Sequence, residues 1–222
     1  MKSSKLLIQS KIFNRLAHVN VFEIGNAARE SKLYVFLGGS GIDETAYFER
    51  SKSLIPLFNE SLTKLERRYV NAVVVYVTSP YDVSFDRISS DNRLALQWER
   101  HVLEELCCEW RNQEFYLMAF SGGTALALSG LHRNPMCKGV GLLGPEQFPS
   151  NWQVPPSWKH PLQVYCARDD LVCSSPTSLR RFELLERQRQ LEVIECDSGG
   201  HSLKNYIDGL FIQAFRFADD CF

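Results

Sequence analysis

Three residue types that together perform nucleophilic catalysis occur in this sequence in the order serine, aspartate, histidine. Ser121 lies in the stretch AFSGG, Asp169 and its neighbour Asp170 lie in RDDLV, and His201 lies in SGGHS. A serine hydroxyl is a poor nucleophile at neutral pH unless a base is within hydrogen-bond reach, and that base needs an acid to fix its tautomer. These side chains could therefore perform acyl transfer if the fold brings them together.

Each of these residues also has an ordinary structural interpretation. Ser121 could cap the helix that follows it, which is a common role for serine. The Asp169–Asp170 doublet could be a solvated turn in which one residue caps a helix, and His201 could be a polar loop residue. His201 differs from the other four histidines because it follows an expected parallel strand in a glycine-rich loop. Asp197, on the same loop, is better explained as a turn residue.

The elements that must position these residues can be recognised from short apolar runs and from helical spacing. Apolar runs of strand length predict strands at 33–37, 72–77, 115–120, 139–143, 162–167 and 191–196, and the first three of these are expected to be buried in the sheet. Partial alternation predicts an antiparallel hairpin of 5–13 and 18–24 with a turn near 14–17. Apolar spacing of three and four residues predicts helices over 44–68, 91–110, 174–190 and 203–218, and an Ala/Leu-rich helix follows Ser121.

Strands that alternate with helices predict an α/β fold, with a mostly parallel sheet of about eight strands and helices on both faces. Ligands of such sheets bind outside the carboxyl ends of the strands. Ser121 follows an expected strand directly, the aspartate doublet and His201 lie in the loops after two others, and the glycine-rich segment 38–41 follows a fourth. The glycine segment lacks the spacing of nucleotide-binding loops. The sequence therefore predicts one catalytic cluster at this edge of the sheet.

The composition limits the other classes of function. With 222 residues, one domain over 1–222 is the simplest organisation. A formal net charge of −1 gives no support to nucleic-acid binding, and no apolar run is long enough to span a membrane. The seven cysteines are odd in number and no secretory signal is apparent, so we expect reduced thiols and a cytoplasmic protein.

The order and placement of these motifs resemble the α/β-hydrolase superfamily from the strand at 33–37 to the final helix. AFSGG resembles the nucleophile elbow, which is the sharp strand-to-helix turn of this family, and VFLGGSG resembles its oxyanion loop. RDDLV resembles the D-x-x-V segment that holds the acid, and SGGHS resembles the histidine loop. The resemblance implies Ser121 as nucleophile, Asp169 as acid by the D-x-x-V register, and His201 as base.

The same resemblance identifies backbone groups that would bind the substrate oxygen. The N–H groups of Ser40 and Gly122 match the family's oxyanion donors, and Gly39 lies in the same loop. Two positions depart from the family pattern. Ala119 replaces the first glycine of the usual G-x-S-x-G, and Gly38 stands where a histidine is common.

The resemblance implies a small serine hydrolase that cleaves a carboxylic ester or thioester through an acyl-enzyme, with no metal or organic cofactor. The expected partner is a small-molecule acyl ester or thioester. The short segment 144–160 implies that no large cap domain covers the site. Two alternatives remain: an acyltransferase that uses the same triad, and a non-catalytic protein of this fold that binds a ligand. The sequence leaves the oligomeric state open.

Overall fold

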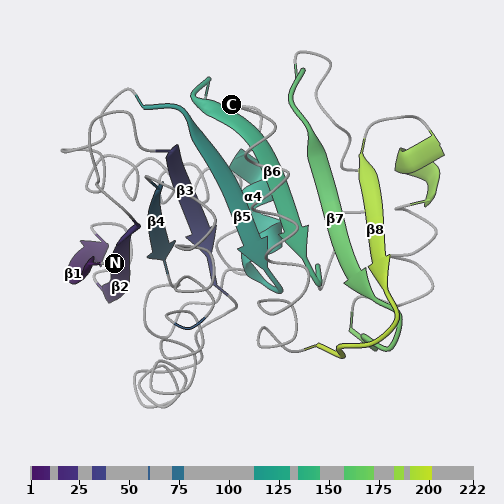
Figure 1. The fold of residues 1–222 in the computed structure, drawn as a ribbon, viewed down its shortest axis with the longest axis horizontal. Helices are drawn as coiled ribbons and strands as arrows, with labels where there is room; N and C mark the ends of the chain where they lie inside the picture. The colour runs from purple at the N-terminus through teal and green to yellow at the C-terminus, as the bar shows by residue number, and fades with distance from the viewer. Residues whose placement is uncertain are drawn as a thin grey trace.

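The structure is a computed structural model, and one central sheet runs through the part of the chain that it describes (Figure 1). The described residues are 2–10, 15–24, 32–38, 60, 72–77, 113–130, 135–145, 158–172, 183–187 and 191–201.

The sheet has eight strands within these residues, and six of them run parallel. The strands are β1 (Lys2–Ser10), β2 (Arg15–Ile24), β3 (Lys32–Leu37), β4 (Ala72–Val77), β5 (Phe115–Phe120), β6 (Cys137–Leu143), β7 (Leu162–Ala167) and β8 (Glu192–Cys196). Their order across the sheet is β1-β2-β4-β3-β5-β6-β7-β8. Strands β3 to β8 pair in parallel, and β1 and β2 extend the sheet in antiparallel fashion. The predicted fold class, a mostly parallel sheet in an α/β protein, is confirmed.

The parallel strands end at a common edge of the sheet, where Figure 1 shows the arrowheads of β3 to β8 together. Parallel pairing places the carboxyl ends of neighbouring strands side by side, so loops far apart in the sequence meet there. Residues 121, 168–172 and 197–201 all leave strands at this edge.

The N-terminal hairpin is present, but its strands differ from the predicted ranges. Strand β1 covers Lys2–Ser10 instead of 5–13, and β2 already begins at Arg15, so the predicted turn at 14–17 is wrong. The pair Ser10–Arg15 is the last one at this end of the ladder. The apolar residues suggested a later first strand, but pairing with β2 extends β1 over the polar segment at 2–4 instead. Strand registers follow pairing partners more closely than local propensity.

Both faces of β3 to β7 are buried, as the continuous apolar runs predict, whereas every residue of β8 is half-buried or exposed. On one face, alternate residues such as Val35, Leu117 and Val164 form a cluster with Ala127 and Leu128. The latter two belong to helix α4 (Gly123–Gly130), which packs against β5, β3 and β6. Because side chains alternate along a strand, the residues between them point to the opposite face. That face holds the largest fully buried side chains, which are Tyr34, Phe36, Tyr116 and Tyr165.

The predicted helices are described only in part. Helix α4 confirms the Ala/Leu-rich helix after Ser121, and 183–187 is helical inside the predicted range 174–190. Residue 60 is helical inside the range 44–68, whereas 91–110 and 203–218 lie outside the described residues. None of the helices in the described part of the chain has the length and apolar character needed to cross a membrane.

The two glycines of β6 allow the ring of Tyr116 to lie across that strand, and they generate a stability prediction. A methyl group at Gly139 would lie 2.4 Å from Cε2 of Tyr116, whereas one at Gly141 would lie 3.2 Å from the hydroxyl oxygen. We expect Gly139→Ala to lower the free energy of unfolding by about 1–3 kcal/mol, because overpacking displaces a fully buried ring. Gly141→Ala is the matched control and should cost less. Urea denaturation would contradict the prediction if both variants matched the wild type.

Candidate active site

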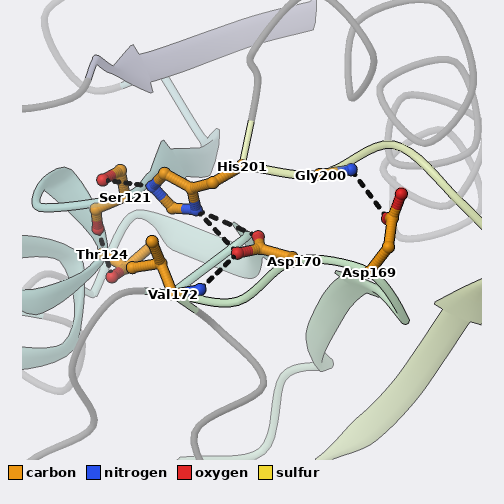
Figure 2. A network of polar contacts seen from close by, with 7 residues as sticks. All are labelled: Ser121, Thr124, Asp169, Asp170, Val172, Gly200 and His201. Carbon is orange, nitrogen blue, oxygen red and sulfur yellow. Dashed lines mark hydrogen bonds and ion pairs between the residues drawn. The ribbon is translucent and has the colours of Figure 1, made fainter.

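Three polar side chains meet at the carboxyl edge of the sheet in one hydrogen-bonded line (Figure 2). Ser121 follows β5, Asp170 lies in the turn after β7, and His201 lies in the loop after β8. The hydroxyl oxygen of Ser121 is 2.9 Å from Nε2 of His201. On the other side of the ring, Nδ1 of His201 is 2.9 Å from Oδ2 and 3.1 Å from Oδ1 of Asp170. The structure thus brings together the predicted serine and histidine.

The chemistry of these groups determines which ring nitrogen holds the proton. An ionised carboxylate only accepts hydrogen bonds, so the neutral imidazole of His201 places its proton on Nδ1, toward Asp170. Nε2 then presents a lone pair, and the hydroxyl of Ser121 donates to it. This tautomer leaves His201 ready to accept a proton from the serine.

The acid beside His201 is Asp170, which corrects the assignment of Asp169 by the D-x-x-V register. Residues 168 and 169 form a turn after β7, and the N–H of Asp170 donates to the carbonyl of Ala167 at 3.0 Å. This tight turn leaves Asp169 exposed and returns Asp170 to the edge of the sheet, where it is fully buried. The Asp169 carboxylate instead accepts the N–H of Gly200 at 2.7 Å, as Figure 2 shows.

The Asp170 carboxylate has hydrogen-bond donors that compensate for its burial. Its exposed fraction is 0%, and a buried charge without partners would be strongly destabilising. Oδ1 accepts the backbone N–H of Val172 at 2.9 Å, in addition to the contact with His201. A donor fixed by the backbone holds the carboxylate in one orientation, and the carboxylate then orients the imidazole.

Phe120 is a further contact of His201 that the sequence interpretation missed. The two rings stack with centroids 5.2 Å apart and planes inclined by 26°. Phe120 is the last residue of β5 and is 8% exposed, so it presents a fixed apolar surface beside the imidazole. In the sequence, this contact was indicated only by the position of Phe120 directly before Ser121.

The corner at Ser121 has the backbone conformation of a strained turn. Its φ is +52°, and among the described residues Ser121 is the one non-glycine residue with a positive φ. Such a conformation costs about 1–3 kcal/mol and persists where the surroundings enforce it. The N–H of Ser121 donates to the carbonyl of Leu143 at 3.1 Å. Thr124 donates twice to the carbonyl of Ser121, from its N–H at 2.9 Å and from its hydroxyl at 2.5 Å.

Close packing around this corner explains how two departures from the family pattern are accommodated. A methyl group at Gly123 would lie 2.5 Å from the carbonyl oxygen of Gly38, so the second glycine of the elbow is needed. Ala119 at the first position is fully buried in the same cluster as Ala127 of α4, and its small side chain leaves the turn at Ser121 intact. At Gly38, a Cβ would lie 2.5 Å from the hydroxyl oxygen of Tyr76, which occupies the space a histidine would need.

The predicted oxyanion donors are described only in part. Gly122 is buried directly after Ser121, and its N–H forms no hydrogen bond with any described residue. It lies at the amino end of α4, where the helix dipole favours negative charge. Gly39 and Ser40 lie outside the described residues, so their part of the prediction stays an expectation.

Two other titratable groups in the described segments do not compete with this cluster. His160 precedes β7 and therefore lies at the opposite edge of the sheet. Cys196 ends β8 near the histidine loop, but burial and, to a smaller extent, the Asp169 carboxylate raise the pKa of its thiol. A protonated thiol is a weak nucleophile.

The double contact from Thr124 predicts a measurable contribution to the stability of the corner. Thr124→Val keeps the shape of the side chain and removes the hydroxyl, so we expect the free energy of unfolding to fall by about 1 kcal/mol. Thr124→Ser keeps the hydroxyl and is the matched control, expected to remain closer to the wild type. Guanidinium denaturation of the three proteins checks this, and equal stability of the valine and serine variants would contradict it.

Comparison with known proteins places this geometry in a structural context. No protein-family model and no curated protein matches the sequence. Solved structures do match in fold, at low sequence identity. A ferulic acid esterase superposes with a TM-score of 0.69 and 14% identity, covering 100% of this chain and 99% of that chain. The carboxylesterase of Bacillus cereus gives 0.62 and 19%, covering 91% and 94%.

A third similar structure is an α/β serine hydrolase without a lid from Xanthomonas campestris. It has a TM-score of 0.62 and 14% identity, covering 98% of this chain and 95% of that chain. These likenesses extend over nearly the whole of each chain. The chain therefore has the α/β-hydrolase fold.

Proposed function

We propose that this protein is a serine hydrolase that cleaves small carboxylic esters or thioesters through an acyl-enzyme. The observation that supports this most strongly is the continuous line of hydrogen bonds from Ser121 through His201 to the buried Asp170. Each of the three groups has the partner that its role requires. The strained conformation of Ser121 adds to this support, because local backbone strain is concentrated at functional sites.

In the first step, Oγ of Ser121 attacks the carbonyl carbon of the substrate while its proton passes to Nε2 of His201. The ring becomes positively charged, and the Asp170 carboxylate at 2.9 Å stabilises that charge. Because Asp170 is already held by Val172, little reorganisation accompanies the proton transfer. The stacked ring of Phe120 keeps the imidazole in the plane in which it contacts both Ser121 and Asp170.

The carbonyl oxygen of the substrate becomes negatively charged in this step and needs fixed donors. The N–H of Gly122, beside the amino end of α4, is available for it. By resemblance to the family, the N–H of Ser40 would be the second donor, with Gly39 shaping the same loop.

The tetrahedral intermediate then collapses and breaks the bond to the leaving group. The departing alcohol or thiol takes the proton from Nε2 of His201, which leaves an acyl ester on Ser121. A water molecule repeats the sequence, with His201 as base and then as acid, and releases the carboxylic acid.

The names of the similar structures support an ester substrate. They include a ferulic acid esterase, a carboxylesterase and a lidless serine hydrolase. A lidless site would suit this chain, in which the 18 residues at 144–161 connect the parallel strands β6 and β7. We therefore infer that the substrate binds in an open site and presents a modest acyl group.

Labelling with a fluorophosphonate probe tests the role of Ser121. The wild-type protein should react covalently and should hydrolyse p-nitrophenyl acetate. Ser121→Ala should lose labelling, and its kcat should fall by about a millionfold, the loss associated with removal of a nucleophilic serine. Ser198→Ala is the matched control, because it removes an exposed serine from the histidine loop and should leave both signals unchanged. A wild type that neither reacts nor hydrolyses the ester would exclude the proposed activity.

The two aspartates are distinguished by substitution with asparagine. Asp170→Asn should lower kcat by about 10³–10⁴-fold, because an amide in contact with Nδ1 no longer selects the reactive tautomer. Asp169→Asn should have a much smaller effect, since its side-chain oxygen can still accept the N–H of Gly200. Steady-state kinetics with p-nitrophenyl acetate compares the two. A greater loss for Asp169→Asn would show that the acid had been assigned incorrectly.

A further inference from the structure

The loops that hold the acid and the base are joined by contacts beyond the His201–Asp170 pair. We call 168–172 the acid loop and 197–201 the histidine loop. The N–H of Arg168 donates to the carbonyl of Cys196 at 2.9 Å, which continues the ladder between β7 and β8. Farther from the strands, the N–H of Gly200 donates to Oδ1 of Asp169 at 2.7 Å.

The histidine loop needs such a contact because its own sequence does little to fix it. Gly200 has a φ of +55°, and no atom lies within 4 Å of the position that a Cβ would occupy there. Glycine loses more conformational freedom on folding than any other residue, so packing alone leaves this peptide poorly restrained. The bond to Asp169 acts on the residue directly before His201, where a change in backbone angle would displace the imidazole.

The other contacts between the loops are weaker candidates for this role. Arg168 forms ion pairs with Glu195 at 3.2 Å and with Asp197 at 3.1 Å. The side chain of Arg168 is 64% exposed and that of Asp197 is 93% exposed, and exposed ion pairs contribute little. The hydrogen bond from the N–H of Gly200 to Asp169 is shorter, at 2.7 Å, and it holds the backbone directly instead of a long side chain.

We propose that Asp169 is a positioning residue, whose carboxylate holds the Gly200 peptide and thereby keeps His201 within reach of both Ser121 and Asp170. This inference rests on the proposed function, because it gives Asp169 a role in the same reaction. Asp169 does not contact the reacting atoms, and it acts through the backbone before the base. The adjacent aspartates thus have separate tasks: Asp170 orients the ring, and Asp169 orients the chain that holds the ring.

Three substitutions separate an effect of the hydrogen bond from an effect of charge. Asp169→Ala removes the acceptor and the charge, whereas Asp169→Asn removes the charge and keeps an oxygen that can accept the N–H of Gly200. Asp197→Asn removes a neighbouring carboxylate of the histidine loop that does not contact Gly200. Because Asp169 is exposed, all three variants should fold, and thermal unfolding checks this.

For p-nitrophenyl acetate, we expect Asp169→Ala to lower kcat by about 10–100-fold with little change in KM, the scale associated with misplacement of a catalytic group by about 1 Å. Asp169→Asn should recover most of this loss, and Asp197→Asn should match the wild type. An Asp169→Ala variant with wild-type kcat would overturn the proposal. So would an Asp169→Asn variant as impaired as the alanine variant, because the effect would then be one of charge.

A second measurement does not depend on turnover. The proton between Nδ1 of His201 and Asp170 should give a low-field resonance in the ¹H NMR spectrum, which Asp170→Asn abolishes. Asp169→Ala should broaden it by faster exchange with water, and Asp169→Asn should preserve it. Broadening in a protein that hydrolyses no ester would support the positioning role and reject the proposed function. An unchanged resonance in Asp169→Ala would reject the positioning role alone.

Discussion

The left-handed backbone conformation of Ser121 is the constraint on which the site depends. A non-glycine residue adopts it only where its neighbours offset the strain. Here the N–H of Ser121 donates to the carbonyl of Leu143. The N–H and the hydroxyl of Thr124 both donate to the carbonyl of Ser121. The absence of a side chain at Gly123 lets α4 begin directly against β3. In this conformation the hydroxyl of Ser121 lies at the edge of the sheet, 2.9 Å from Nε2 of His201.

The site also requires that three side chains far apart in the sequence lie close together, and the parallel sheet achieves this. Ser121, Asp170 and His201 come from the ends of β5, β7 and β8, and parallel pairing puts all three ends on one edge. Burial on both faces makes β5 and β7 rigid supports, since their side chains are packed from either side. Loops that leave such strands need to fix only a few residues to position a side chain, as the short turn from Ala167 to Asp170 illustrates.

The parts of this structure that the sequence predicts are those governed by burial and strand position. Continuous apolar runs located the parallel strands to within about two residues, and with them the positions of Ser121 and His201. The choice between Asp169 and Asp170 depended on the hydrogen bonding of one turn, which adjacent identical residues do not reveal. The stacking of Phe120 on His201 was equally hidden, because it joins residues far apart in the chain. The strands of the N-terminal hairpin differ from their predicted ranges because an edge strand takes its register from its partner.

The separations along the chain between the three polar groups have a consequence for how the site assembles during folding. Asp170 and His201 are 31 residues apart, whereas Ser121 and His201 are 80 apart. The entropy of closing a loop grows as (3/2)RT ln n, so the longer closure costs about 0.8 kcal/mol more, from (3/2)RT ln(80/31). The acid and the base lie at the ends of the neighbouring strands β7 and β8, so they meet at a lower entropic cost than the base and the nucleophile. The nucleophile comes from β5, which is separated from β7 by β6, so its placement depends on pairing over a longer stretch of the chain.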